Sequence, residues 1–336
     1  MLRFDDARLD DTELVLGDTG QPLRHLALAG ARLRQALGLA DFAALSAVAD
    51  GVTPRAIVAV GPEARLIRAV AEPVCPVPLV AWAPPGLPAW VGALDLVVFV
   101  SGDRAADGAT MADAIRRGAL VLVISAGSGA VTEHAVGRSV AALATGTDDA
   151  FVSATIGLAS LARLGFAPAV NPERVADGLD QVAAACSPQA PLGRNPAKDT
   201  AVSLADAIPL VWGGPVLAAR AARRIAEAIR QVSHRAALAA DAAELWPVLR
   251  GCRPPDVFAD PFFDPADDLT YCLVRLDDGC PEPGRGAAGD QLEQVAEAHG
   301  VRVARIRYDE GTALERYACL LQHGRFAAAY LGLGLV

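Results

Sequence analysis

Long apolar runs, aromatic side chains and excess positive charge are all scarce in this sequence of 336 residues. No apolar run reaches the roughly 18 residues that a membrane-spanning helix needs, and the acidic start MLRFDDARLDD lacks the apolar segment of a signal peptide. Aromatic residues make up 5% of the chain, so we expect a core of Ala, Val and Leu in closely packed helices. The net charge of −9 argues against extended contact with nucleic acid or a membrane surface. We therefore expect a soluble, cytoplasmic protein.

The six cysteines show neither a CxxC pair nor a spacing typical of metal ligands. Cys272 lies in an apolar strand pattern and Cys319 in a helix pattern, where a thiol packs as a small hydrophobic side chain. We expect reduced, structural cysteines, no metal site and no cofactor. Gly213-Gly214 follows a predicted strand, but without GxGxxG it does not predict a dinucleotide site.

The central feature of the sequence is the stretch Leu87–Gly129. It contains a wholly apolar strand, Leu96–Val100, then a polar turn opening on Ser101-Gly102-Asp103 and a helix. A second apolar strand, Leu120–Ile124, ends on the turn Ser125–Gly129. Strands that are apolar on both faces are typical of parallel sheets covered by helices, and ligands bind at the carboxyl ends of such strands. Because the first turn leads into a helix with free N–H groups, an anion such as phosphate is the expected ligand.

The rest of the chain predicts two similar lobes. The first half has strands at Arg55–Val60, Val77–Ala81, Leu96–Val100 and Leu120–Ile124, the second of them at a sheet edge because of Pro78. Its predicted helices are Pro22–Leu37, Ala64–Ala71, Glu133–Leu143, the strongly apolar Phe151–Phe166, and Pro172–Ala185. Residues Ser187–Lys198 are rich in Pro and Gly and predict a linker, with Asn195 capping a helix that starts at Pro196.

After the linker the pattern restarts, with strands at Ile208–Trp212, Tyr271–Leu276 and Val301–Ile306. The helices predicted there are Ala197–Ala207, Val216–Ser233, Asp290–Ala298 and Thr312–Leu331. This alternation predicts an α/β protein with two doubly wound, parallel, three-layer lobes that arose by internal duplication. We place the lobes at residues 1–190 and 191–336.

Three segments make the sequence resemble the sugar isomerase (SIS) domain. They are LPAWVGALDLVVFVSG with the later RRGALVLVISAG, Asn195-Pro196-Ala197-Lys198 with IPLVWGGPVLAARAARRIAEAI, and VRVARIRYDEGTALERYACLLQHGRFAAAYLGLGL. The resemblance is strongest to the bifunctional phosphoglucose/phosphomannose isomerase family, in its actinobacterial TobH-like branch. It extends from about Arg55 to Leu335 and implies a two-lobed SIS fold.

The resemblance also implies a binding site for a sugar phosphate. The family holds the phosphate with an SGNT turn, which appears here as Ser101, Gly102, Asp103 and Arg104, in a longer turn that reaches Thr110. The polar turn after the following strand contributes Ser125, Gly127 and Ser128. A second interpretation of Ser101 is a plain helix cap.

The family's glycine-rich turn after the first strand is replaced here by Gly61-Pro62-Glu63-Ala64-Arg65. Glu63 repels a phosphate, whereas Arg65 or Arg104 offers a compensating bidentate clamp.

The catalytic positions that the resemblance implies are altered. Isomerisation needs a base that moves a proton between C1 and C2 and a donor that opens the sugar ring. Matching without gaps puts Gln231 at the family's glutamate and Pro247 at its histidine, and neither moves a proton. Substitutes at hand are Glu227, His234 and Glu244, although each also fits a structural role: a solvated helix residue, a helix cap and a surface charge.

Three functions follow from these expectations. The first is a sugar-phosphate protein that binds glucose, mannose or fructose 6-phosphate between its lobes, with altered or lost isomerase chemistry. The second is a non-catalytic regulatory or scaffolding SIS module in carbohydrate metabolism, and the third is an active isomerase with a relocated base. A homodimer is expected, and neither nucleic acid nor a membrane is an expected partner.

Overall fold

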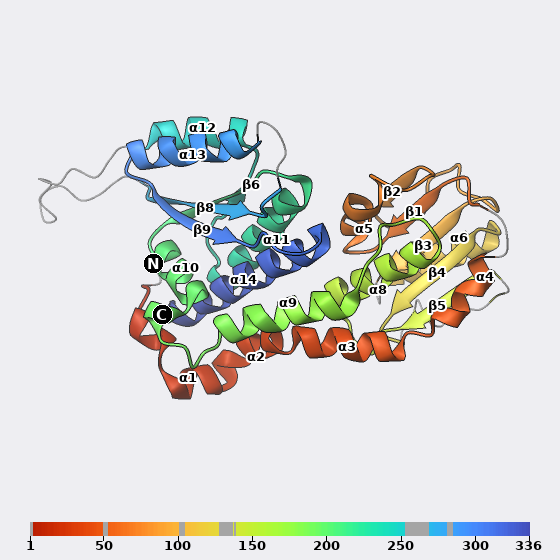
Figure 1. Ribbon diagram of the computed structural model, residues 1–336, viewed down its shortest axis with the longest axis horizontal. Coiled ribbons are helices and arrows are strands. Elements are labelled where there is room, and N and C mark those ends of the chain that lie inside the picture. Colours follow the sequence, from red (N-terminus) through yellow and green to blue (C-terminus); the bar gives the residue numbers. More distant parts are fainter. Residues whose placement is uncertain are drawn as a thin grey trace, which may run out of the picture. The chain divides into compact units, whose positions relative to one another are not determined.

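The computed structural model describes residues 3–49, 53–100, 105–127, 137, 139–252, 269–280 and 285–336, with no side chains for 105, 106, 285 and 286. The chain forms two compact units, which are coloured by sequence in Figure 1. The middle unit is Gly30–Ala176, and the terminal unit combines Met1–Ala29 with Asp177–Val336.

The middle unit contains a parallel sheet of five strands in the order β2-β1-β3-β4-β5. The strands are β1 (Ile57–Val60), β2 (Leu79–Trp82), β3 (Leu96–Val100), β4 (Leu120–Ser125) and β5 (Val140–Ala144). Every residue of β1 and β3 is buried, as their unbroken apolar sequences predict. The prediction that the second strand lies at a sheet edge is confirmed. In this strand order the chain reverses direction between β1 and β3, which is where ligands of such sheets bind.

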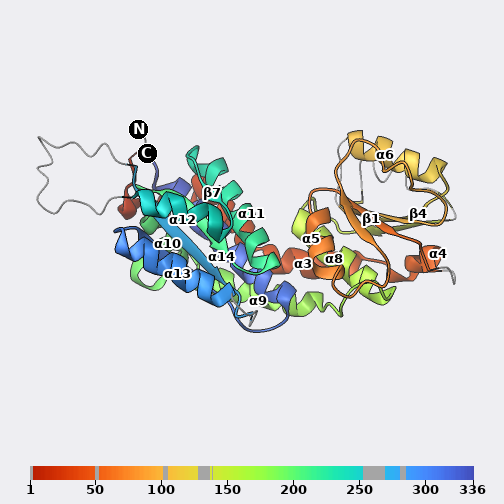
Figure 2. The same cartoon turned by 90° about the horizontal axis from the view of Figure 1, so that it is seen from above.

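Helices cover both faces of this sheet. Figure 2 shows α6 (Ala105–Arg116) on one face and α5 (Ala64–Ala71) with α8 (Ala150–Arg163) on the other. On the α6 face, Met111 and Ala114 pack against Val58, Phe99 and other strand residues. On the opposite face, α8 is buried from Phe151 to Leu161, so the expectation from its apolar sequence holds. The remaining helices of the middle unit, apart from the shared α9, are α3 (Ala29–Leu39), η3 (Phe42–Leu45) and α4 (Ser46–Ala49).

The terminal unit contains a second parallel sheet, in the order β7-β6-β8-β9. Its strands are β6 (Ile208–Gly213), β7 (Leu238–Ala239), β8 (Tyr271–Asp277) and β9 (Arg302–Arg307). Numbered along the chain, this is the same 2-1-3-4 order as in the middle unit, and the predicted pair of doubly wound lobes is confirmed. Its helices are α9 (Pro172–Ala185, which begins in the middle unit), η4 (Leu192–Arg194), α10 (Pro196–Leu204), α11 (Val216–Ser233), α12 (Ala242–Gly251), α13 (Arg285–Ala298) and α14 (Ala313–Gly334).

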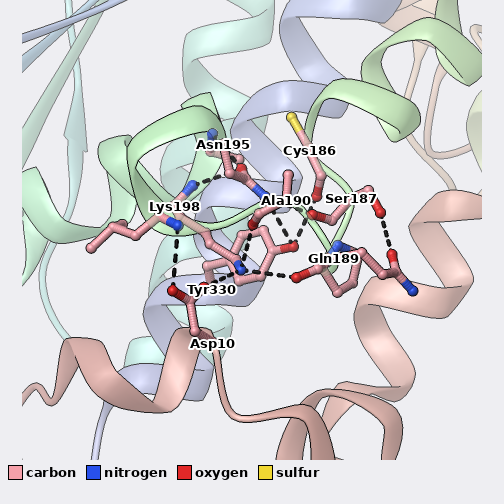
Figure 3. Close-up of polar contacts among 11 residues, drawn as sticks. Asp10, Cys186, Ser187, Gln189, Ala190, Asn195, Lys198 and Tyr330 are labelled. Atoms are coloured by element: carbon pink, nitrogen blue, oxygen red, sulfur yellow. Dashed lines mark hydrogen bonds and ion pairs between the residues drawn. The ribbon is translucent and has the colours of Figure 1, made fainter.

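The N-terminal segment packs on the terminal unit, through η1 (Asp6–Leu9), α1 (Thr12–Leu16), η2 (Asp18–Gly20) and α2 (Gln21–Ala27). Phe4 forms a bridge with Leu335, and the Gln322 amide donates to the Leu26 carbonyl. Lys198 is fully buried and its ammonium donates to Asp10 (Figure 3). The compact units therefore divide the chain differently from the boundary at 190 and 191 that the sequence suggested. Local sequence patterns do not report these contacts, which join residues more than 180 positions apart.

Residues Ser187–Lys198, predicted as a linker, are folded into the terminal unit. The Asn195 amide donates to the Ser187 carbonyl (3.0 Å), and Lys198 donates to the carbonyls of Pro188 (3.0 Å) and Ala190 (2.9 Å). The Pro- and Gly-rich sequence marks an irregular backbone, but buried side chains fix that backbone in place. Asn195 does cap α10 and Pro196 is its first residue, as predicted.

Other local predictions differ from the structure. Part of the helix predicted over Glu133–Leu143 is the strand β5, because pairing with β4 outweighs the helix preference of alanine. The helix predicted over Pro22–Leu37 is divided at Leu28 into α2 and α3. The sequence analysis missed β7 and α12 altogether.

The cysteines behave as predicted. All six are free thiols, and Cys272 and Cys319 lie in β8 and α14. Burial raises the pKa of Cys272 and Cys319 to about 11, so these thiols stay protonated and unreactive at neutral pH. In the described part of the chain, no helix is long and apolar enough to cross a membrane.

Candidate functional site at the carboxyl edge of the middle sheet

Polar groups gather where the strands of the middle unit end. Strand β1 leads through Gly61, whose φ of 125° favours glycine, and Pro62 to Glu63, which precedes α5. Strands β3 and β4 end side by side, since Val100 pairs with Ile124 in the parallel register. Together the ends of β1, β3 and β4 form the edge at which the strand order predicts a ligand.

Five of the predicted binding residues lie outside the described residues: Ser101, Gly102, Asp103, Arg104 and Ser128. Their roles stay predictions from the sequence. The other three, Thr110, Ser125 and Gly127, are described, and all belong to segments that follow or end strands at this edge.

Thr110 holds a loop. It lies in α6, is 1% exposed, and its hydroxyl accepts a hydrogen bond from the Gly86 amide at 3.0 Å. The Gly86 carbonyl in turn accepts from the indole nitrogen of Trp82 at 3.1 Å. Thr110 thus fixes the loop after β2, a function that the sequence analysis did not foresee.

Ser125 and Gly127 shape the end of β4. Ser125 is 6% exposed, and its carbonyl accepts from both the amide (2.7 Å) and the hydroxyl (2.9 Å) of Thr145. Gly127 has a φ of 96°, a conformation that favours glycine. These contacts join the ends of β4 and β5.

Charged groups of both signs lie at this edge. Glu63 and Asp107 are each 1% exposed, one before α5 and one in the first turn of α6. Arg65 is exposed in the first turn of α5, and among the described residues it has no carboxylate partner. On the same helix, Arg68 is held by Glu72 with bonds of 2.9 and 3.0 Å. Arg65 is therefore the cation of α5 that is available to an external anion, while Glu63 and Asp107 oppose that anion.

The three candidate substitutes for the catalytic base belong to the terminal unit, where each has a structural role. The Arg224 guanidinium donates to Glu227 at 2.5 Å. His234 is exposed in the left-handed conformation (φ 53°) and its amide caps α11 by donating to the Arg230 carbonyl. Glu244 completes a capping box in which it accepts from the Asp241 amide at 3.1 Å.

Gln231 and Pro247, which the resemblance matches to the family's base and ring-opening acid, are both exposed on helices, α11 and α12. The contacts thus support a structural role, not a catalytic one, for the substitutes Glu227, His234 and Glu244. Asp107 and Trp82 are the residues of the edge that sequence reasoning missed. The position of Trp82 at the end of a predicted edge strand was the available signal.

The terminal unit buries an imidazole that titrates abnormally. His323 is 5% exposed, and burial lowers its pKa to about 4, so the ring is neutral at physiological pH. Its ring nitrogens lie 3.2 Å from the Tyr308 hydroxyl and 3.5 Å from the Thr200 hydroxyl. Burial also raises the pKa of Tyr308 well above its ordinary value. Within the described ranges, no group of three or more His, Cys, Asp or Glu residues is arranged to hold a metal ion.

A family model matches the C-terminal part of this chain. Residues 193–335 match the family model of the bacterial phospho-glucose isomerase C-terminal SIS domain. The comparison with curated proteins finds no match.

Several solved structures are similar over nearly the whole chain. Tagatose-6-phosphate ketose/aldose isomerase from Escherichia coli has a TM-score of 0.66 at 16% identity, covering 94% of this chain and 93% of that one. The C-terminal domain of glucosamine-fructose-6-phosphate aminotransferase from Francisella tularensis has a TM-score of 0.64 at 11% identity, covering 94% and 97%. A glucose-6-phosphate isomerase like protein from Thermus thermophilus has a TM-score of 0.54 at 17% identity, covering 97% and 92%. The fold is therefore the two-lobed SIS fold of phosphosugar isomerases, and the predicted resemblance to a SIS protein is confirmed.

Proposed function

We propose that this chain binds a hexose phosphate at the carboxyl edge of the middle sheet, with isomerase chemistry that is altered or lost. The match of residues 193–335 to a phospho-glucose isomerase SIS domain supports the sugar-phosphate class. The strand order supports the position of the site, because it puts the reversal of the chain between β1 and β3.

The anion-binding part of the proposal depends on the exposed position of Arg65. An exposed guanidinium in the first turn of a helix adds its charge to the positive end of the helix dipole. Arginine also matches phosphate with two parallel N–H donors. Because Glu63 and Asp107 lie buried at the same edge, we expect the affinity for phosphate to be modest.

The loss of isomerase chemistry is supported by what replaces the acid and base. Gln231 has no proton to exchange at neutral pH, and Pro247 has no titratable group at all. Glu227, His234 and Glu244 are engaged in an ion pair and two helix caps on the surface of the terminal unit. A general base must reach the proton that it removes. Side chains that are held in an ion pair or a helix cap are poorly suited to this role.

A regulatory or scaffolding module that binds no sugar is the second candidate. The observation in its favour is the pair of buried carboxylates, Glu63 and Asp107, at the edge where an anion is expected. Such a module would use the SIS fold without the family's ligand.

A thermal-shift titration with glucose, mannose and fructose 6-phosphate separates these candidates. We expect a ligand-dependent rise of the melting temperature in the wild type and in Arg68→Gln, and a much smaller rise in Arg65→Gln and Ser101→Ala. Arg68 is the matched control because it is an arginine of the same helix that Glu72 already binds. No shift with any of the three ligands would refute the proposal and favour the scaffold.

A coupled assay for fructose 6-phosphate then tests the chemistry. We expect turnover from glucose or mannose 6-phosphate to be absent or slow, and unchanged in Glu244→Gln and His234→Ala. Fast turnover that either substitution abolishes, with the fold intact, would show that a relocated base is at work.

A further inference from the structure

The middle unit exposes two tryptophans, and they lie at opposite edges of its sheet. Trp82 ends β2 and is 38% exposed, so more than a third of its surface is open to a ligand. Trp90 precedes β3 and is 45% exposed. Its ring lies near Arg55, whose amide donates to the Leu94 carbonyl just before that strand. Only Trp82 is at the carboxyl edge.

The register puts Trp82 next to the proposed site. Trp82 pairs with Val60, the last residue of β1, and neighbouring residues of paired strands point to the same face. Val60 packs in the core cluster beneath α6, together with Leu87 and Val91 of the loop that follows Trp82. The indole therefore lies on the α6 face, one strand away from the point where the chain reverses.

Hydrogen bonds hold the indole in place. Its N–H donates to the Gly86 carbonyl at 3.1 Å, and the Gly86 amide donates to the Thr110 hydroxyl of α6 at 3.0 Å. Gly86 has a φ of 81°, which favours glycine at this turn. With its polar atom already bonded, the exposed part of Trp82 is a flat apolar surface of fixed orientation.

We propose that Trp82 is the sugar-recognition residue of the site, with the C–H face of the hexose ring packing on the indole while the phosphate lies toward the helix N-termini. This inference rests on the proposed function and deepens it, because it assigns the sugar and the phosphate to different residues. Thr110 acts in it as a positioning residue, which holds Trp82 through Gly86 and leaves the phosphate to other groups. Covering half of the exposed indole with apolar sugar carbons corresponds to about tenfold in affinity.

The test compares two ligands, glucose 6-phosphate and inorganic phosphate, by calorimetric titration of the full chain. Trp82→Ala should weaken glucose 6-phosphate binding about tenfold and leave inorganic phosphate binding unchanged. Thr110→Val should show the same selective loss, whereas Arg65→Gln should weaken both ligands. Trp90→Ala is the matched control and should leave both affinities at the wild-type value.

Fluorescence keeps the test valid if Trp82→Ala does not fold. In Trp90→Phe, addition of glucose 6-phosphate should change the emission, because Trp82 is the remaining indole of the middle unit. In Trp82→Phe it should not, since Trp90, the remaining indole of the middle unit, precedes β3 and lies at the opposite edge of the sheet.

The outcomes separate the two proposals. Unchanged glucose 6-phosphate affinity in Trp82→Ala, or equal losses for sugar phosphate and phosphate in Thr110→Val, would overturn the role of Trp82 while the binding site stands. Failure of the wild type to bind either ligand would overturn the proposed function, and the present inference with it.

Discussion

The ion pair between Lys198 and Asp10 should contribute strongly to the stability of the fold, although one of its two partners is exposed. The Lys198 side chain is fully buried, whereas that of Asp10 is 48% exposed. The ammonium donates to Asp10 at 2.6 Å and to two backbone carbonyls, and it lies 5.4 Å from the centre of the Tyr330 ring (Figure 3). All three N–H donors of the lysine are thus used, and water does not reach it.

The magnitude follows from which charge is buried. Asp10→Asn leaves a buried ammonium without a counter-charge, a change that costs about 3–5 kcal/mol for a fully buried pair. The half-exposed carboxylate is partly screened by water, which lowers our expectation to about 2–3 kcal/mol. In a Lys198→Met background there is no ammonium to compensate, so Asp10→Asn should cost almost nothing. The double-mutant cycle should therefore give a coupling of about 2–3 kcal/mol.

Urea unfolding at pH 7 measures the cycle. Asp6→Asn controls for the loss of one charge, because Asp6 is an exposed aspartate at the start of η1, the helix whose end Asp10 caps. Lys198 is also the only lysine in the sequence, so acetylation at this residue, read by mass spectrometry apart from that of the N-terminal amine, reports on its exposure. We expect Lys198 to resist acetylation in the wild type and in Asp6→Asn, and to react faster in Asp10→Asn. A coupling below about 1 kcal/mol, typical of exposed pairs, would refute the argument.

The same pair predicts a pH dependence. The hydrogen bond from Lys198 holds the pKa of Asp10 below its ordinary value of 3.8. A carboxylate with a lowered pKa in the fold adds stability above its unfolded pKa and loses it as the pH falls through the folded value. The coupling should accordingly be complete at pH 7 and shrink below about pH 4.

Three further predictions concern His323 and Gly213 of the terminal unit and Gly38 of the middle unit. Because burial lowers the pKa of His323 from 6.5 to about 4, the unfolded chain binds the extra proton first, and stability should fall by about 3 kcal/mol between pH 6.5 and pH 4. Urea unfolding across this range should show that the free energy of unfolding falls less with decreasing pH in His323→Phe than in the wild type. An equal fall in both proteins would contradict the prediction. Gly213→Ala should lower stability by about 3 kcal/mol or more, because its Cβ would lie 2.4 Å from the Ala218 carbonyl group. Gly38→Ala, with no neighbouring atom within 4 Å in a helix, should instead raise stability by about 0.5–1 kcal/mol, as measured by the same unfolding experiment.

The sequence predicts those parts of the fold that depend on local pattern. The helices Ala64–Ala71, Pro172–Ala185 and Val216–Ser233 have the predicted bounds, because apolar spacing and flanking Gly or Pro define them. β5 was predicted as a helix, since the alanine-rich sequence VAALA forms a strand only by pairing with β4. The attachment of residues 3–29 to the terminal unit depends on single side chains such as Lys198, whose partners are distant in the sequence.

For the site, the sequence indicates the edge of the sheet but not the function of each residue. Ser125 and Gly127 do lie at the end of β4, whereas Thr110, expected at a phosphate, bonds a loop amide. The sequence puts Thr110 in a long turn before the helix, whereas the structure places it within α6. Its partner depends on how the loop after β2 folds back over the sheet, which no spacing in the sequence records.

The terminal unit has a corresponding edge to compare with the proposed site, at the reversal between β6 and β8. There, Gly213 lies close against the backbone of α11, so a side chain at this position would clash with it.

The carboxylates at the end of β8 bond their own loop, with Asp277 accepting from the Gly279 amide (2.9 Å) and Asp278 from the Cys280 amide (3.1 Å). At the end of β9, Arg307 is held by Asp309 at 2.8 Å. These polar groups of the terminal edge are thus bonded within the unit, whereas the middle edge has Arg65 and a fixed, exposed indole. Since both sheets have the same strand order, topology alone does not choose between the two edges. The side chains differ between the edges, and this difference is why we propose the anion site in the middle unit.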